Sequence, residues 1–85
     1  PRKRHLIKEV HTDIYALDSR VPISVANEVL GVSFPDREAH TVGGLVTARL
    51  RRIPRVGDSI VEEGLLITVE EANDRSPLRL KITPA

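Results

Sequence analysis

The spacing of apolar residues changes twice along the chain, and this change constrains the fold more than any other feature. Residues 6–10 alternate as in a half-buried strand, and after a polar corner at 11–13 a second strand-like run covers 14–17. Over 25–32 and again over 42–53, on either side of a predicted loop at 33–39, the apolar residues recur every three or four positions, as on one face of a helix. Alternation returns over 59–82, interrupted by turn residues. The pattern predicts two strands, two helices and then three strands.

This order of elements predicts an α+β fold. We expect an antiparallel sheet of about five strands, in the sequence order ββααβββ, with two short helices on one face. The last predicted strand alternates apolar and basic residues from Leu78 to Ile82. One face of the sheet should therefore be exposed to solvent, and the helices should cover the other face.

Individual residues predict where the turns and helices begin and end. Ser24 is the predicted N-cap of the first helix after Pro22, and Gly31 ends that helix. Thr41 is the predicted N-cap of the second helix, and Pro54 is its predicted stop, because proline cannot donate the helical hydrogen bond. The second helix carries an apolar stripe: Val42, Leu45, Val46, Leu50 and Ile53. A tight hairpin turn is predicted at Glu63-Gly64.

Composition disfavours several classes of function. Thirteen Lys and Arg against twelve Asp and Glu give a net charge of +1, which provides no field to collect nucleic acid or an anionic membrane surface. The chain has no cysteine, so disulfides and thiolate chemistry are excluded. Its apolar runs are far shorter than the roughly 20 residues of a membrane-spanning helix. We therefore predict no nucleic-acid partner and no direct membrane insertion.

Neither catalysis nor a metal centre is predicted. The serines lack a G-x-S-x-G setting, and no H-E-x-x-H sequence is present. His5 and His11 would lie roughly 20 Å apart along one strand, too far for shared coordination. His40 stands alone.

A glycine pair at the start of the second helix is the candidate ligand site. The amides of Gly43 and Gly44, with the Thr41 hydroxyl, could hold a phosphate or another anion at the positive end of the helix dipole. The pair lacks both the G-x-G-x-x-G and the G-x-x-x-x-G-K-[ST] patterns. The favoured interpretation is structural, because two residues without bulk let a helix pack closely against its neighbours.

The densest basic cluster is the candidate protein-contact site: Arg49, Arg51, Arg52 and Arg55. Cations are expected at a helix C-terminus from the dipole alone, so a solvated surface is the plainer interpretation. Acidic counterparts at 62–63, 70–71 and 74 are interpreted as charges that protect hairpin edges from association.

Several strings closely resemble the transporter-associated CorC/HlyC domain, over about residues 13–83. They are 14–23, 27–32, T-V-G-G-L-V from Thr41, I-P-R-V-G-D from Ile53 and G-L-L-I-T-V from Gly64. The T-x-G-G-L-[VI] helix start and the I-P-x-x-G-D turn are the most specific. The resemblance places the domain at 13–85. The basic start of the chain, which lacks an initiator Met, predicts that 1–12 is a linker and first strand cut from a larger protein.

The resemblance implies a cytoplasmic accessory domain with no catalysis of its own. In that family the domain lies at the C-terminus of hemolysin-like and magnesium or cobalt efflux proteins, usually after a pair of CBS modules, and at the end of some cation/proton antiporters. It implies regulation by contact with the rest of the parent protein, whether CBS modules or a membrane domain, and homodimerisation stays open. The cluster contains more arginine than is usual in the family, which leaves open a docking role particular to the parent protein of this chain.

The resemblance also bears on whether the domain binds a cofactor or a small ligand. The family fold is described as similar to part of a flavin-binding domain, but small helices leave little room for a flavin, and we predict no cofactor. The alternative function is a small-ligand sensor that binds a nucleotide or another anion at Gly43-Gly44.

Overall fold

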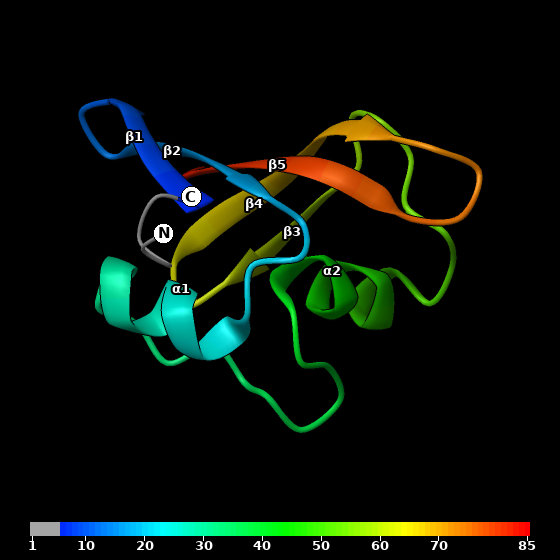
Figure 1. Ribbon diagram of the computed structural model, residues 1–85, viewed down its shortest axis with the longest axis horizontal. Helices are drawn as coiled ribbons and strands as arrows, with labels where there is room; N and C mark the ends of the chain where they lie inside the picture. The colour runs from blue at the N-terminus through cyan, green and yellow to red at the C-terminus, as the bar shows by residue number, and fades with distance from the viewer. Residues whose placement is uncertain (1–5) are drawn as a thin grey trace.

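The computed structural model describes residues 6–85, which form an antiparallel sheet with two helices on one face (Figure 1). The strands are β1 (Ile7–His11), β2 (Ile14–Asp18), β3 (Ser59–Glu62), β4 (Leu65–Ala72) and β5 (Pro77–Pro84). The helices are α1 (Ile23–Leu30) and α2 (Val42–Leu50). The predicted α+β class and the order ββααβββ are confirmed. The basic segment at 1–5, with His5, lies outside the described residues.

Strand β5, the last in the chain, lies at the centre of the sheet. The spatial order is β1-β2-β5-β4-β3, so β5 joins a hairpin of β1 and β2 to a hairpin of β3 and β4. Its Ile82 pairs with Tyr15 on one side and with Ile67 on the other. The predicted turn at Glu63-Gly64 is confirmed, with φ of 53° and 75°, as a two-residue hairpin turn requires.

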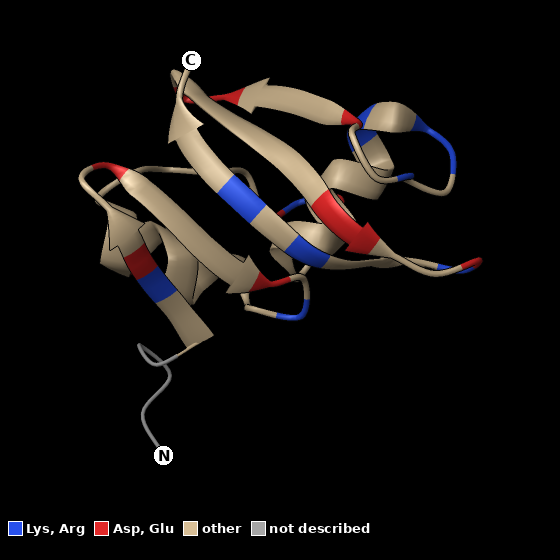
Figure 2. Cartoon of the chain, turned by 90° about the horizontal axis from the view of Figure 1, so that it is seen from above, with Lys and Arg blue, Asp and Glu red and all other residues tan. Residues whose placement is uncertain are grey.

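The core lies between the sheet and the helices, and the opposite face of the sheet carries charged residues (Figure 2). Leu80 and Ile82 of β5 are buried, whereas Arg79 is exposed, as the alternation predicts. Leu78 departs from the pattern and is 39% exposed. The reason is an irregular register between Val69 and Ala72, where a bulge breaks the alternation.

The predicted N-cap of α1 is wrong. Pro22 is the N-cap, and no side chain caps this helix. The helix starts at Ile23, whose amide donates to the carbonyl of His40 at 2.9 Å, so Ser24 lies exposed inside the first turn. Gly31 ends the helix in the left-handed conformation, as predicted.

Helix α2 begins as predicted and ends earlier than predicted. The Thr41 hydroxyl accepts from the amide of Gly44 at 3.0 Å, which confirms the cap. The helix ends when Arg51 adopts a left-handed conformation (φ 58°), three residues before Pro54. Ile53 therefore leaves the predicted apolar stripe and is 48% exposed.

Candidate functional site

The amides at the start of α2 all have acceptors within the domain. They donate as follows: Val42 to the carbonyl of Val21 (2.9 Å), Gly43 to the carbonyl of Ser19 (2.8 Å), Gly44 to the Thr41 hydroxyl (3.0 Å) and Leu45 to the carbonyl of Thr41 (3.0 Å). An anion that binds these amides would have to replace one of their acceptors or share an amide with it. The ligand site at Thr41, Gly43 and Gly44 stays a prediction.

Gly43 contacts the end of β2 at a distance that leaves no room for a side chain. A Cβ at this position would lie 2.7 Å from Cβ and 2.8 Å from the carbonyl oxygen of Ser19. Ser19 is buried, and its hydroxyl donates to the carbonyl of Pro77 at 2.6 Å. The close-packing interpretation is thus confirmed for Gly43. The sequence analysis missed Ser19, because nothing in the sequence distinguishes it from the other serines.

Two of the four predicted contact arginines are held by carboxylates of the domain. Arg49 donates to Glu62 at 2.6 Å and to Glu38 at 2.7 Å, which ties α2 to β3 and to the loop before α2. Arg52 donates from both terminal nitrogens to Asp58, at 2.8 and 2.9 Å. Of the four arginines only Arg49 lies in the last turn of α2, so the dipole explanation applies to that residue alone.

Asp58 organises the loop that follows α2. Besides binding Arg52, it accepts from the amide of Arg55 at 2.7 Å. The same loop pairs with β4, because the amide of Gly57 donates to Val69 (2.9 Å) and the amide of Val69 donates to Asp58 (2.8 Å). The hydrogen bonds from Arg52, and then from the Arg55 amide, lower the pKa of Asp58 to about 2.

We expect the contribution of Asp58 to stability to depend on pH. Its pKa is depressed in the folded state, so its stabilising effect is present at pH values above about 4 and is lost as the pH falls toward about 2. The thermal midpoint of Asp58→Asn should lie below that of the wild type at neutral pH, and the gap should narrow in acid. Asp36→Asn, on an exposed loop, controls for the loss of one charge. A gap that is constant with pH would contradict the role assigned to Asp58.

Arg51 and Arg55 differ from the other two arginines. Both are exposed, and neither forms an ion pair with any carboxylate of residues 6–85. They follow α2 in the loop that Asp58 holds. This loop, residues 51–58, is called the arginine loop below.

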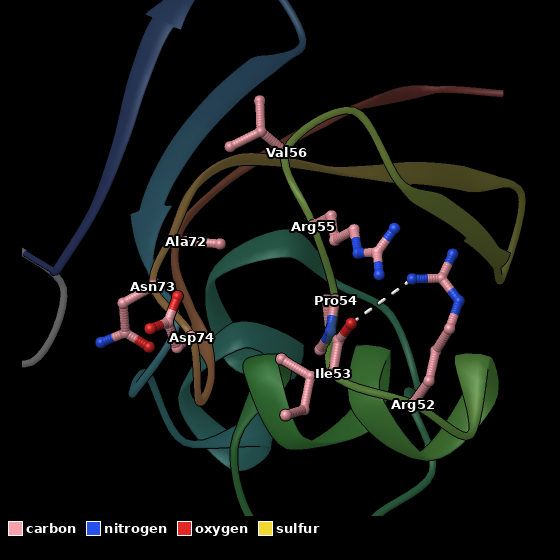
Figure 3. Close-up of a pocket in the computed structure, with 8 residues that line it drawn as sticks. All are labelled: Arg52, Ile53, Pro54, Arg55, Val56, Ala72, Asn73 and Asp74. Atoms are coloured by element: carbon pink, nitrogen blue, oxygen red, sulfur yellow. Dashed lines mark hydrogen bonds between the residues drawn. The ribbon is translucent and has the colours of Figure 1, made fainter.

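A groove of about 490 Å³ lies between the arginine loop and the turn that joins β4 to β5 (Figure 3). Residues 52–56 form one bank, and 72–74 form the other. The first bank exposes two large apolar side chains, Ile53 at 48% and Val56 at 65%. The second bank presents Ala72 and the carboxylate of Asp74.

The second bank is also fixed by hydrogen bonds. The side-chain oxygen of Asn73 accepts from the amides of Arg75 (2.8 Å) and Ser76 (2.9 Å), and the Asn73 amide donates to Ser76 (3.0 Å). The sequence analysis missed this bank, since it treated 73–77 only as a turn. The N-x-x-S pattern from Asn73 predicts a turn stabilised by a side chain, but it does not predict that the arginine loop lies across the groove from this turn.

Neither a cluster of metal-ligating side chains nor a helix that could cross a membrane is found among the described residues. Within 6–85, no group of three or more His, Asp or Glu is placed to hold a metal ion. His11 and His40 are exposed on separate elements. No helix of this part of the chain is long and apolar enough to cross a membrane.

Comparison with known proteins identifies similar domains. The CorC_HlyC family model, described as a transporter associated domain, matches residues 8–85. The chain is 35% identical over 80 residues to a Rickettsia bellii protein named "Possible hemolysin C". It is 26% identical over 77 residues to the magnesium and cobalt efflux protein CorC of Buchnera aphidicola. These alignments cover 89% and 91% of this chain but 26% of each relative, so the chain spans about a quarter of their length.

A solved structure extends the comparison to the fold. The CorC-associated region from Neisseria meningitidis superimposes with a TM-score of 0.89 and 29% sequence identity. The superposition covers 94% of this chain and 99% of that one. The match with the family model begins at residue 8 and so covers all of β1 except Ile7.

Proposed function

The chain belongs to the CorC/HlyC transporter associated domain family, and we propose from this premise that it is a non-catalytic regulatory domain acting by protein contact. Its relatives are named as hemolysin-like and magnesium and cobalt efflux proteins, and each is about four times as long as the aligned part. The proposed partner is the rest of such a longer protein, namely its CBS modules or its membrane domain, on the cytoplasmic side of the membrane. The proposed role is to regulate cation transport.

The observation that carries this proposal is the surface of the arginine loop. It presents Arg51 and Arg55 without ion pairs within 6–85, beside the exposed Ile53 and Val56. Arginine and apolar side chains on a fixed backbone are typical of protein interfaces. Because Asp58 holds the loop, little conformational entropy is lost when a partner binds.

The test is a charge reversal at the two unpaired arginines. Arg51→Glu combined with Arg55→Glu should leave the fold intact, because exposed substitutions usually shift stability by no more than about 0.5 kcal/mol. The double variant should bind the rest of the longer protein more weakly, with a salt dependence that the wild type shows and the variant lacks. Pull-down and titration of this chain against the remaining domains measure the effect, and ion flux through the whole protein reports its consequence.

The controls separate a contact role from a folding role. Arg37→Glu reverses one charge on an exposed loop outside the groove, and it is compared with Arg51→Glu and with Arg55→Glu made singly. Arg52→Glu is unsuitable, because it would place two carboxylates at the Asp58 ion pair. Unaltered binding and unaltered flux in a folded Arg51→Glu, Arg55→Glu variant would refute the proposal.

A further inference from the structure

A row of uncharged, mostly apolar side chains crosses the face of the sheet that points away from the helices. Its members are Ile14 of β2, Val61 of β3, Leu66 of β4 and Thr83 of β5. The pairing of β3 with β4, of β4 with β5 and of β2 with β5 places these four residues side by side. They are called the solvent-face row below.

The solvent-face row lies opposite the core, because side chains alternate between the two faces of a sheet. Its neighbours along β4 and β5, Ile67 and Ile82, are buried in the core. Val61 is 59% exposed, and the other three members are half-buried. Figure 2 looks onto this face and shows the last part of β5, which carries Thr83, without charged residues. The row is thus an apolar strip open to solvent.

The next row on the same face is polar and basic. It lies two residues further along each strand, about 7 Å away. Lys8 pairs with Ala16, Ala16 with Lys81, and Lys81 with Thr68. Lys8 forms no ion pair with a carboxylate of 6–85, and Lys81 lies 4.0 Å from Glu70. The apolar strip is therefore narrow and has positive charge along one side.

The width of this strip selects the kind of element that can cover it. A second sheet, such as that of another copy, would cover both rows and would take Lys8 and Lys81 out of water. An extended segment laid on the face of a sheet gains no backbone hydrogen bonds from it. A single helix satisfies its own backbone and is about 10 Å wide, so it covers one row and leaves the lysines at its flank. We infer that the solvent-face row is a docking site for an amphipathic helix whose flank toward Lys8 and Lys81 is acidic.

The helix belongs to the rest of the longer protein. The row crosses four strands, so it spans three spacings of about 4.8 Å each, which a helix of about ten residues covers. Both helices of 6–85 already lie on the other face of the sheet (Figure 1). The aligned part is 26% of the relatives named above, so ample chain beyond this domain is available to supply the helix. The inference rests on the proposed function only in taking the domain to be part of such a protein.

Binding of this chain to the remaining domains measures the contribution of the row. Val61→Thr combined with Leu66→Thr makes the row polar with a residue that suits a strand, and it should weaken binding about tenfold or more. The loss should persist at high salt, unlike that of Arg51→Glu with Arg55→Glu. Leu78→Thr makes the same change at an exposed position at the other end of β5 and should leave binding unchanged. Circular dichroism verifies each fold, and Val61→Thr alone is measured if the double variant unfolds.

A charge reversal tests the acidic flank. Lys8→Glu places like charges at this flank and should weaken binding at low salt and less so at high salt. Arg37→Glu reverses one charge on an exposed loop and is the matched control, which should bind as the wild type does.

Photo-crosslinking identifies the occupant directly. The variant Val61→p-benzoylphenylalanine is made in the longer protein and irradiated, and the crosslinked residues are located by mass spectrometry. They should lie three or four positions apart in one segment outside this chain, as on one face of a helix.

Three results would overturn the inference. They are unaltered binding by the folded row variant, unaltered binding by Lys8→Glu, and crosslinks that join Val61 to a second copy of this chain or to lipid. If the row variant binds normally while Arg51→Glu with Arg55→Glu does not, the inference fails and the proposed function stands. If the row variant loses binding and the crosslinks reach a helix while the arginine variant binds normally, the contact proposed for the arginine loop fails and the inference stands.

Discussion

We expect Leu45→Ala to lower the free energy of unfolding by about 2–5 kcal/mol, because it removes buried methyl groups and leaves a cavity. Leu45 is 1% exposed and belongs to the core cluster that α2 shares with β4 and β5. A domain of this size has a total stability of about 4–13 kcal/mol, so the loss is a large fraction of the whole. Urea denaturation at neutral pH measures it as a fall in the transition midpoint.

Ser24→Ala is the matched control for this prediction. Ser24 is exposed in the first turn of α1 and caps nothing, so its replacement should shift the midpoint little. Arg49→Ala is less suitable, because Arg49 binds both Glu62 and Glu38. Equal midpoints for Leu45→Ala and Ser24→Ala would contradict the placement of α2 against the sheet.

The second large effect is expected at Gly43. Alanine is intrinsically better than glycine in a helix by about 1 kcal/mol, so a helix without close neighbours would gain stability from Gly43→Ala. Here the new Cβ would lie 2.7 Å from Cβ and 2.8 Å from the carbonyl oxygen of Ser19. We therefore expect a net loss of about 1–3 kcal/mol as the start of α2 moves away from β2.

Gly44→Ala is the comparison that isolates this contact. Its Cβ would lie 3.1 Å from the Cβ of Ala39 and from the Thr41 hydroxyl, so only a small adjustment is required. The loss should be clearly smaller than for Gly43→Ala in the same denaturation experiment. A Gly43→Ala variant as stable as the wild type would show that the backbone at the end of β2 can shift with little loss of folding free energy.

Local sequence patterns predicted the elements well because they depend on neighbouring residues. The turn at Glu63-Gly64 needs only residues that accept positive φ, and the Thr41 cap needs only a hydroxyl three residues before an amide. The errors arose where tertiary contacts decided the outcome. Ser24 is not the N-cap of α1, because the hydrogen bond from the Ile23 amide to the His40 carbonyl starts the helix one residue earlier. Helix α2 ends before Pro54, because Arg51 adopts the left-handed conformation.

The candidate site was predicted only in part. The arginines and the I-P-R-V-G-D string were evident in the sequence, but their ion pairs were not. Arg49 meets Glu62 across 13 positions, and only the packing of α2 beside β3 brings them together. Because Arg49 and Arg52 are both held by carboxylates of the domain, we infer that Arg51 and Arg55 are the stronger contact candidates, and the contact site stays a prediction.

The class of fold and the order of its elements follow from the amino-acid sequence, because periodicity, caps and turns act over a few residues. The family follows from the resemblance of the strings that begin at Thr41 and Ile53. Long-range packing, which no local pattern specifies, places β5 between the two hairpins and sets the turn at 72–74 opposite the arginine loop. These placements depend on which apolar faces bury most surface together, a property of the assembled core. The groove exists because β4 continues to Ala72, beyond Thr68, which pairs with the first residue of β3, so that residues distant in the chain form the two banks.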